Sequence, residues 1–147
     1  MIEALSSAFE RLMFLKRKIF RHILAEEDVY PGQPGVLFHL FHHPESDQKA
    51  IAEALGITPA SATVMLRRME QAGLIQRARD PADRRRILVS LTPKGREKVE
   101  RLKEKIDSFH RTMFGVLSPE EQSTCIALFR RLASHLSRTY GIQEPEE

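Results

Sequence analysis

Residues 47–92 read DQKAIAEALGITPASATVMLRRMEQAGLIQRARDPADRRRILVSLT, and they carry the strongest indications of the fold. Two short helices, a turn that ends in glycine and an arginine-rich hairpin follow one another along this segment. We expect the first helix over Asp47–Leu55, because Ser46 and Asp47 offer side-chain oxygens that can cap its first N–H groups. Gly56 can adopt the left-handed conformation that ends a helix, so the helix stops there.

The second helix begins after Thr58, with Pro59 at the first helical position, where the missing N–H is no loss, and it ends at Gly73. A helical wheel divides its residues into two sides. The apolar side gathers Ala62, Met65, Leu66, Met69 and Ala72, and the other side gathers Ala60, Ser61, Thr63, Val64, Arg67 and Arg68.

The second side of this helix has the chemistry that suits a DNA major groove. Short side chains let the backbone approach base edges, and the methyl groups of Thr and Val can meet thymine methyls. An arginine can bind guanine or grip a phosphate. The alternative for this helix alone is an ordinary amphipathic helix with a solvated arginine pair.

A β-hairpin is predicted after the second helix. Its strands are Ile75–Arg79 and Arg86–Leu91, and the turn residues Asp80-Pro81-Ala82-Asp83 lie between them. Alternate residues of the second strand are apolar, as expected for a half-buried strand: Ile87, Val89 and Leu91.

Positive charge is concentrated in the same region. Residues 67–86 hold seven arginines and three acidic residues, a net charge of +4, whereas the whole chain has a net charge of +3. Clustering of this kind is the electrostatic footprint of nucleic-acid binding, and an arginine at a hairpin tip can enter a narrow minor groove. The alternative is a solvated run of charges.

A set of motif positions runs from the second helix to the end of the hairpin: Pro59, Thr63, Arg68, Glu70, Gly73-Leu74-Ile75, Arg77, Asp80-Pro81, Asp83-Arg84-Arg85 and Leu91-Thr92-Pro93-Lys94-Gly95. At these positions the chain resembles the MarR family of bacterial winged helix-turn-helix transcription regulators. The resemblance implies a mainly α fold with a small β-hairpin wing (α+β) and long N- and C-terminal dimerisation helices. It also implies that residues 59–73 are the recognition helix. Within the wing motif, it implies that Arg85 reaches the minor groove and that Asp83 helps to hold it.

Two sets of residues are therefore expected to bind DNA. On the recognition helix they are Ala60, Ser61, Thr63, Val64, Arg67 and Arg68. On the wing they are Arg77, Arg79, Asp83, Arg84, Arg85 and Arg86.

Outside this region, long helices carry apolar stripes that one copy of the chain cannot bury completely. The stripes are Leu5, Phe9, Leu12, Ile19 and Ile23 near the N-terminus; Val99, Leu102, Ile106, Phe109 and Met113 after Thr92-Pro93; and Ile126, Phe129, Leu132, Leu136 and Tyr140 near the C-terminus. Ser118-Pro119-Glu120-Glu121 forms a capping box at the start of the last helix.

We expect one intertwined domain with three parts. Residues 1–30 and 93–143 form a helical dimerisation region, residues 31–92 form the DNA-binding lobe, and residues 144–147 form an acidic tail. An isologous homodimer would hold two recognition helices about one DNA turn apart, each reading half of a palindromic operator. The alternative is a monomer in which the helices close an intramolecular bundle.

The resemblance also implies modulation by an effector, whose site differs between members. Phe14, Phe20, Phe38, Phe41, Phe109 and Phe114 can line a pocket for a small aromatic or phenolic ligand, or they can fill the core. A zinc site would draw on His39, His42 and His110, although their spacing is no metal signature. His39 and His42 can share a helix face, and His43 is expected to point away from both. We assign no metal and no cofactor.

Cys125 lies among apolar residues of the last helix, which favours a buried structural thiol over an oxidant sensor. A single cysteine, no apolar run of membrane-spanning length and no signal-peptide layout predict a protein of the cytoplasm without membrane contact.

Catalysis has no support, since the chain lacks a phosphate-binding glycine loop, an HExxH motif and a nucleophile motif. The prediction is a sequence-specific transcription regulator that binds double-stranded DNA, acting as a repressor. The alternatives are a winged-helix adaptor, a sequence-tolerant nucleic-acid binder and a zinc-responsive regulator.

Overall fold

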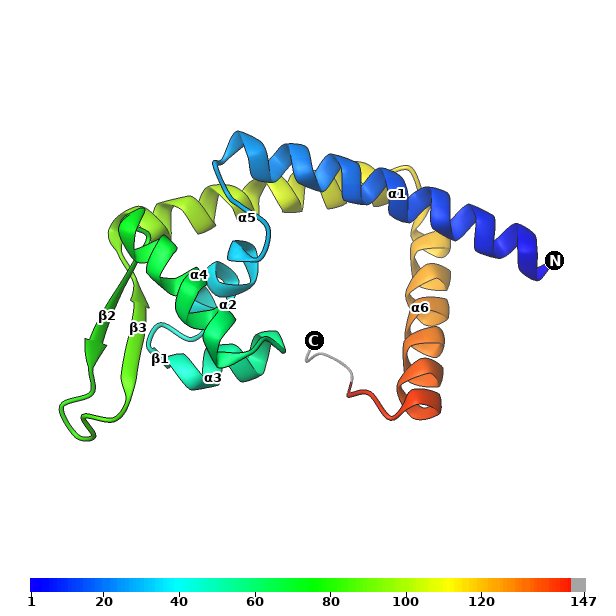
Figure 1. The fold of residues 1–147 in the computed structure, drawn as a ribbon. Coiled ribbons are helices and arrows are strands. Elements are labelled where there is room, and N and C mark those ends of the chain that lie inside the picture. The colour runs from blue at the N-terminus through cyan, green and yellow to red at the C-terminus, as the bar shows by residue number, and fades with distance from the viewer. Residues whose placement is uncertain (144–147) are drawn as a thin grey trace. The chain divides into compact units, whose positions relative to one another are not determined.

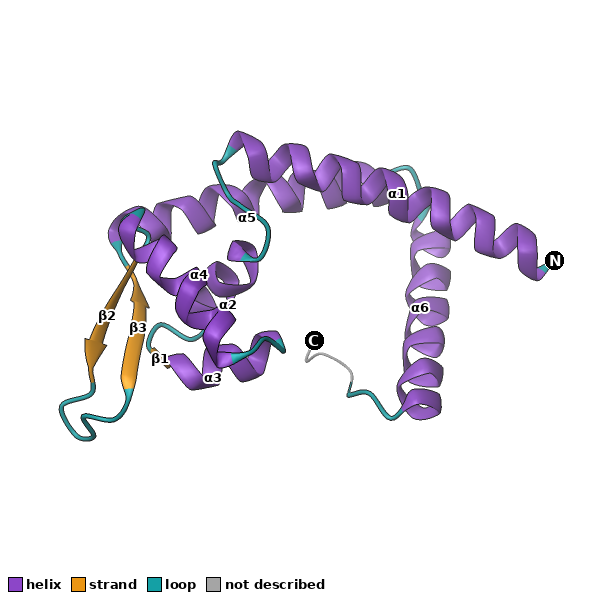
Figure 2. Ribbon diagram, in the orientation of Figure 1, coloured by secondary structure: helices purple, strands orange, loops and turns teal. Residues whose placement is uncertain are grey.

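The structure is a computed structural model that describes residues 1–143, and the predicted acidic tail at 144–147 lies outside this range. Helices make up most of the described chain, with one small antiparallel sheet (Figure 2). The elements in chain order are α1 (Ile2–Glu26), α2 (Gln33–His42), β1 (Ser46–Asp47), α3 (Gln48–Leu55), α4 (Pro59–Gln71), β2 (Ile75–Arg79), β3 (Ile87–Leu91), α5 (Pro93–Phe114) and α6 (Pro119–Tyr140) (Figure 1). The predicted fold class, mainly helical with a β-hairpin wing, is confirmed.

The chain divides into two compact units whose border falls within α5. The first contains residues 1–106 and the second starts at residue 107. All strands and the two central helices α3 and α4 belong to the first unit. We describe each unit by itself.

The ends of α3 and α4 are fixed largely as the sequence predicts. Asp47 Oδ1 accepts a hydrogen bond of 2.7 Å from the backbone N–H of Lys49, and Gly56 ends α3 in the left-handed region with φ 63°. The Thr58 hydroxyl oxygen accepts from the N–H of Ser61 at the start of α4. Ser46, however, does not cap α3, because its hydroxyl lies 3.1 Å from His39 Nε2 and donates to the carbonyl of His43.

The sheet has the strand order β1-β3-β2, with both pairs antiparallel. The two-residue strand β1 was not predicted; Ser46 pairs with Val89 there. Val89 is completely buried, but Ile87 is 38% exposed. The prediction of regular burial along the second strand is therefore wrong at Ile87, because that end of β3 extends past the core into the wing.

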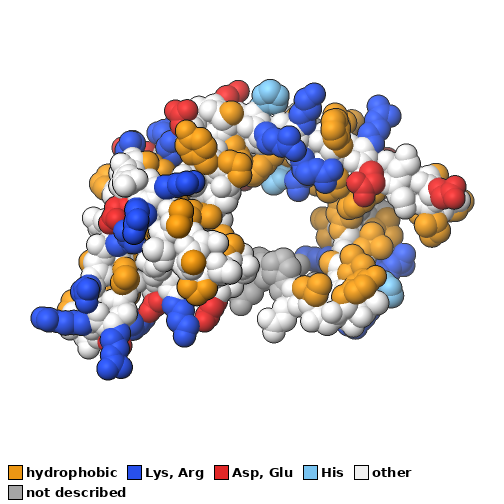
Figure 3. All heavy atoms as spheres, in the orientation of Figure 1, with side chains coloured by type: hydrophobic (Ala, Val, Ile, Leu, Met, Phe, Trp, Pro, Cys, Tyr) orange, Lys and Arg blue, Asp and Glu red, His pale blue; other side chains and the backbone are white. Residues whose placement is uncertain are grey.

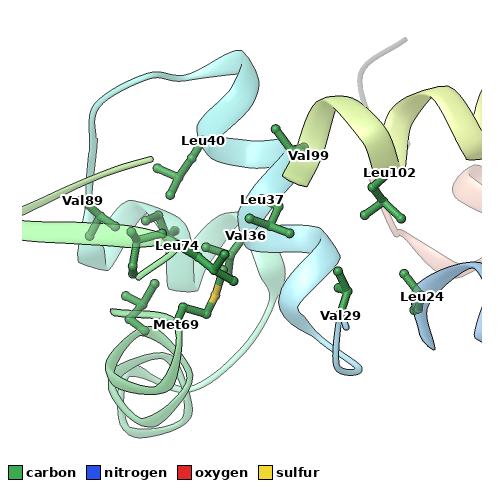
Figure 4. Close-up of a cluster of buried hydrophobic side chains, with 13 residues drawn as sticks. Leu24, Val29, Val36, Leu37, Leu40, Met69, Leu74, Val89, Val99 and Leu102 are labelled. Atoms are coloured by element: carbon green, nitrogen blue, oxygen red, sulfur yellow. The ribbon is translucent and has the colours of Figure 1, made fainter. Parts of the chain in front are cut away.

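A single cluster of apolar side chains holds the first unit together (Figure 4). It draws on the end of α1, on α2, on the two central helices, on the sheet and on α5. Its fully buried members include Leu37, Leu40, Ile51, Leu66, Met69, Val89, Val99 and Leu102. Thus Val99 and Leu102, part of a stripe expected to need a partner, are buried within one copy. Phe20, Phe38 and Phe41 pack against the same cluster, which is the core-filling alternative for these three residues.

Charged groups join the end of α1 to α5 within the first unit. Lys105 Nζ lies 2.8 Å from a Glu26 oxygen and 2.9 Å from a Glu27 oxygen, and Arg101 Nε lies 3.0 Å from Glu27. Lys98 Nζ donates to the backbone carbonyl of Glu27 and so caps the end of α1. The hydrogen bond from Lys105 lowers the pKa of Glu27, which keeps this carboxylate ionised.

The second unit contains the end of α5 and all of α6. The capping box at Ser118 and Glu121 is present in both directions, as predicted. No residue of α6 is buried. Its apolar stripe is open to solvent in one copy, with Leu132 59% and Leu136 54% exposed. Orange apolar side chains cover this helix in the space-filling view (Figure 3). No helix among residues 1–143 is long and apolar enough to cross a membrane.

Candidate nucleic-acid interface

The outward side of α4 presents most of the residues expected to face DNA. Ala60, Ser61, Arg67 and Arg68 are exposed, and Val64 is 52% exposed. Within residues 1–143, neither the Arg67 nor the Arg68 guanidinium has a hydrogen-bond or ion-pair partner. Two free cationic groups therefore stand on one face of the helix.

Thr63 is placed differently from the other residues of this set. It is half-buried, and its hydroxyl accepts a hydrogen bond of 3.0 Å from Gln48 Nε2 while it donates to the Pro59 carbonyl. The hydroxyl therefore links α3 to α4. The amide oxygen of the same side chain, Gln48 Oε1, is buried and has no hydrogen-bond partner among the described residues.

The opposite side of α4 anchors the helix in the first unit. Ala62, Leu66 and Met69 are buried, as the helical wheel predicts. Burial along α4 thus follows the helical period: one side of the helix packs on the core, and the other side is free to contact a partner.

The C-terminal end of α4 is held by residues at the start of α5. The Thr92 hydroxyl donates to the carbonyl of Gly73, and Lys94 Nζ donates to the carbonyl of Ala72 at 2.9 Å. Ala72 is the C-cap residue of α4, where backbone acceptors lack helical partners, and Gly73 follows it. In the sequence, Thr92 and Lys94 are recognised only as positions that match the family motif. Their hydrogen bonds to Gly73 and Ala72 join residues 19 and 22 positions apart, and such contacts leave no periodic pattern in the sequence.

Two aspartates shape the wing loop between β2 and β3. Asp80 Oδ1 accepts from the N–H of Ala82 at 2.8 Å, and Asp83 Oδ1 accepts from the N–H of Arg85 at 3.0 Å. Such side-chain-to-backbone bonds stabilise tight turns. Asp83 therefore contacts the backbone of Arg85 and fixes the turn from which the Arg85 side chain projects.

Arg86 and Arg77 make ion pairs inside the lobe. Arg86 Nε lies 2.8 Å from Asp47 Oδ2, and Arg86 Nη1 lies 3.3 Å from Asp80 Oδ2. Arg77 binds Glu70 at 2.6 Å and so joins β2 to α4. The hydrogen bond from Arg86 lowers the pKa of Asp47, and the hydrogen bond from Arg77 lowers the pKa of Glu70.

The remaining wing arginines point their charge outward. Arg79 is exposed and makes one long hydrogen bond, 3.4 Å, to the carbonyl of Arg84. The guanidinium groups of Arg84 and Arg85 have no partner in the part of the chain that the structure describes. Blue cationic side chains accordingly stand out from the wing in the space-filling view (Figure 3).

The candidate zinc ligands are not gathered together. His39 hydrogen-bonds Ser46, and its ring lies 4.7 Å from the ring of His43. The expectation that His43 points away is therefore wrong, because residues four apart share one helix face. His42 is exposed and contacts Phe41, whereas His110 lies in the second unit between Phe109 and Phe114. Among residues 1–143, no three His, Cys, Asp or Glu side chains are grouped as metal ligands.

Cys125 is half-buried and lines a small hollow of the second unit together with Phe114, Ile126 and Phe129. Phe14 is 58% exposed on α1. The six phenylalanines considered for an effector pocket therefore belong to several different environments.

Helices α3 and α4, followed by a basic hairpin, make the first unit a winged helix-turn-helix. Residues 29–87 match the family model described as MarR family. A relative, the putative transcriptional regulatory protein for the hcr operon of Thauera aromatica, is 32% identical over 123 residues, which cover 84% of this chain and 74% of the relative.

Solved structures with this fold include DNA complexes. A point mutant of S. aureus MepR matches with a TM-score of 0.81 and 28% identity, over 89% of this chain and 97% of that one. The transcriptional repressor CouR bound to a 23-mer DNA duplex matches with a TM-score of 0.72 and 30% identity, over 88% of this chain and 92% of that one. The chain belongs to the MarR family. It is a DNA-binding transcriptional regulator and not an enzyme.

Proposed function

We propose that this regulator is a repressor that binds a palindromic operator as a homodimer and is modulated by a small ligand. One observation carries the proposal: the chain has exposed arginines on α4 and the wing, and it also has exposed apolar faces on other helices. The first feature supports binding to DNA, and the second supports association with another copy. The similarity to a structure described as a transcriptional repressor supports the direction of regulation.

The dimer is supported by apolar side chains that one copy leaves in water. On α1 these include Leu5, 62% exposed, and Phe9, 56% exposed; on α6 they include Leu132 and Leu136. Monomers rarely expose contiguous apolar faces of this kind. In the proposed dimer, residues 1–30 and 93–143 supply the dimerisation region and residues 31–92 supply the DNA-binding lobe.

The geometry refines the proposed DNA contacts. Ala60, Ser61, Val64, Arg67 and Arg68 would face the major groove, with Thr63 contributing its methyl group while its hydroxyl stays bonded within the lobe. Arg84 and Arg85 would enter or flank the minor groove, with Arg79 beside them. Arg77 and Arg86 would act mainly by holding the wing in place, because both are engaged with carboxylates.

The proposed effector is a small aromatic or phenolic compound, as the resemblance implies. Since Phe20, Phe38 and Phe41 pack against the core, the dimer is a better place than one copy to seek the binding site. Thermal unfolding in the presence of a panel of aromatic acids tests this part, because a ligand that binds only the folded state raises the melting temperature.

Selection of bound duplexes from a random DNA pool at physiological salt, followed by sequencing, tests the proposed function. Enrichment of a palindrome with half-sites about one helical turn apart would support a dimeric sequence-specific regulator. A retained pool that stays random would instead indicate contacts to the backbone alone, and a pool that is not retained would indicate an adaptor. Loss of transcription from a promoter that carries the selected palindrome then establishes repression.

A further inference from the structure

A groove runs along one flank of α4 and shares Ala60, Ser61, Val64 and Arg68 with the face proposed to enter the major groove. Its volume is about 880 Å³, and it lies within the first unit. One wall is formed by Tyr30 and Pro31, which lie between α1 and α2, and by Gln33, the first residue of α2. The other wall is α4, with Val64, Met65 and Arg68. The lining includes no acidic residue.

Gln33 brings a hydrogen-bond donor to this groove. Its residue is only 7% exposed, and its Oε1 atom accepts a hydrogen bond of 3.1 Å from the backbone N–H of Tyr30. That bond fixes the orientation of the amide and leaves the NH₂ group without a protein partner among residues 1–143. Because Gln33 lines the groove, its NH₂ group is a fixed donor available to an acceptor that enters there.

The wall that carries Gln33 is fixed against α4. Gly32 has φ 89°, and a Cβ atom added to it would lie 2.8 Å from the Met65 side-chain methyl. The preceding loop therefore rests directly on the recognition helix. Gln33 and Arg68 thus lie on opposite walls of one groove, and these walls meet where Gly32 approaches the Met65 side chain.

The chemistry of the groove selects an anionic ligand with an apolar part. Arg68 supplies a positive charge, and the Gln33 NH₂ and Ser61 hydroxyl supply donors. Val64, Met65 and Pro31 supply apolar surface of the kind that packs against a sugar ring. A DNA strand offers both, as a phosphate joined to deoxyribose, and it would pass this flank when α4 lies in the major groove.

We propose that this groove seats the DNA backbone, with the Gln33 NH₂ group and the Arg68 guanidinium binding one phosphate from opposite sides. The proposal rests on the recognition helix assigned above and adds a contact from outside the helix and the wing. A phosphate clamp here would fix how deeply and at what angle the recognition helix enters the groove, while carrying no sequence information.

The variant Gln33→Glu tests the clamp. The carboxylate keeps an oxygen that can accept from the N–H of Tyr30 and replaces the donor with negative charge. Gln143→Glu is the matched control, since it makes the same chemical change at an exposed residue after α6. Fluorescence anisotropy with a random duplex and with the selected operator should show that Gln33→Glu weakens binding to both roughly tenfold or more, with their ratio unchanged.

Equal affinity of Gln33→Glu and Gln143→Glu for the random duplex would overturn the clamp. This comparison uses the random duplex and needs no operator. The proposed function is tested separately, because it fails if the wild-type chain selects no palindrome. Thermal unfolding checks that Gln33→Glu is folded.

A second measurement uses the wild-type protein alone. The side-chain ¹⁵N–¹H signals of Gln33 should shift on adding a duplex, and neutralising a single phosphate as a methylphosphonate should abolish the shift. Signals that do not move with DNA would contradict the proposal.

Discussion

Helices α4 and α6 begin with the same two devices, a hydroxyl N-cap at Thr58 or Ser118 and a proline at the first helical position. Their surroundings differ. Helix α4 buries three residues in the core, whereas none of the residues of α6 is buried in one copy. Local sequence thus suffices to start both helices, but of the two only α4 buries side chains among residues 1–143. Association with another surface would bury the apolar face of α6, and we propose that this surface is a second copy of the chain.

The largest effect is expected from breaking the exposed face of α6. Leu132→Asp places a charge where the proposed dimer buries an apolar side chain, so it should raise the dimer dissociation constant at least about tenfold. Sedimentation velocity measures the change. Ala127→Asp, on the opposite side of the helix, adds the same charge and should leave the dimer intact. A Leu132→Asp chain that stays dimeric would remove the proposed contrast with α4.

Within the lobe, an outward arginine should affect DNA and not folding. Arg85→Ala removes a free guanidinium from the wing, and the affinity for the operator should fall by about 1–3 kcal/mol. Anisotropy titration measures this loss, with Arg131→Ala on α6 as a control that removes the same charge. Affinity like that of the wild type would show that Arg85 does not touch DNA.

An inward arginine should behave in the opposite way. Arg77→Ala breaks the ion pair with Glu70 between β2 and α4, and the free energy of unfolding should fall by about 1 kcal/mol or less, because the pair is partly exposed to water. Urea denaturation of Arg77→Ala and Arg67→Ala separates the two kinds of arginine, since Arg67 has no partner to lose among the described residues. Equal stability of both variants and the wild type would mean that the ion pair does not hold the wing.

The smallest effect concerns pH. Burial and the neighbouring His43 lower the pKa of His39 below its ordinary value of 6.5, so the folded protein favours the neutral ring. The unfolded chain therefore binds more protons as the pH falls, and the stability present above pH 6.5 is lost as the pH falls through the lowered pKa. The melting temperature should fall by about a few degrees at most between roughly pH 7 and pH 5.5.

His39→Gln provides the control for this titration, because it keeps a donor near Ser46 without a titrating ring. The fall in melting temperature should be smaller in this variant. An identical pH dependence in the wild type and His39→Gln would assign the effect to other groups.

Much of the lobe could be predicted from the sequence because its signals are local. The caps at Asp47 and Thr58 each act within three residues of themselves, as does the cap at Ser118 in the second unit, and the helical wheel of α4 separates buried Leu66 from exposed Arg67. The strands of the wing could also be predicted from local features, namely the turn residues between them and the alternating apolar residues of β3. Strand β1 was missed because two residues are too few to show an alternating pattern.

The roles of the arginines could not be read from composition. Arg85 and Arg86 are neighbours of the same type, yet Arg86 is bound to Asp47, 39 positions away in the sequence. Only the pairing of β1 with β3 brings these two residues together. In the same way, no sequence pattern marks Gln33, because its proposed role depends on a donor left free by the hydrogen bond that its Oε1 accepts from Tyr30.

The junction of α4 with α5 is a stiff joint. Thr92 and Lys94 bind the carbonyls of Gly73 and Ala72, which directly follow α4, and the backbone N–H of Thr92 donates to the carbonyl of Leu74. These hydrogen bonds connect the end of the recognition helix α4 to the start of α5, so we expect the two to move together. In the proposed dimer, a ligand that tilts α5 slightly would change the distance between the two reading helices without unfolding any part of the lobe.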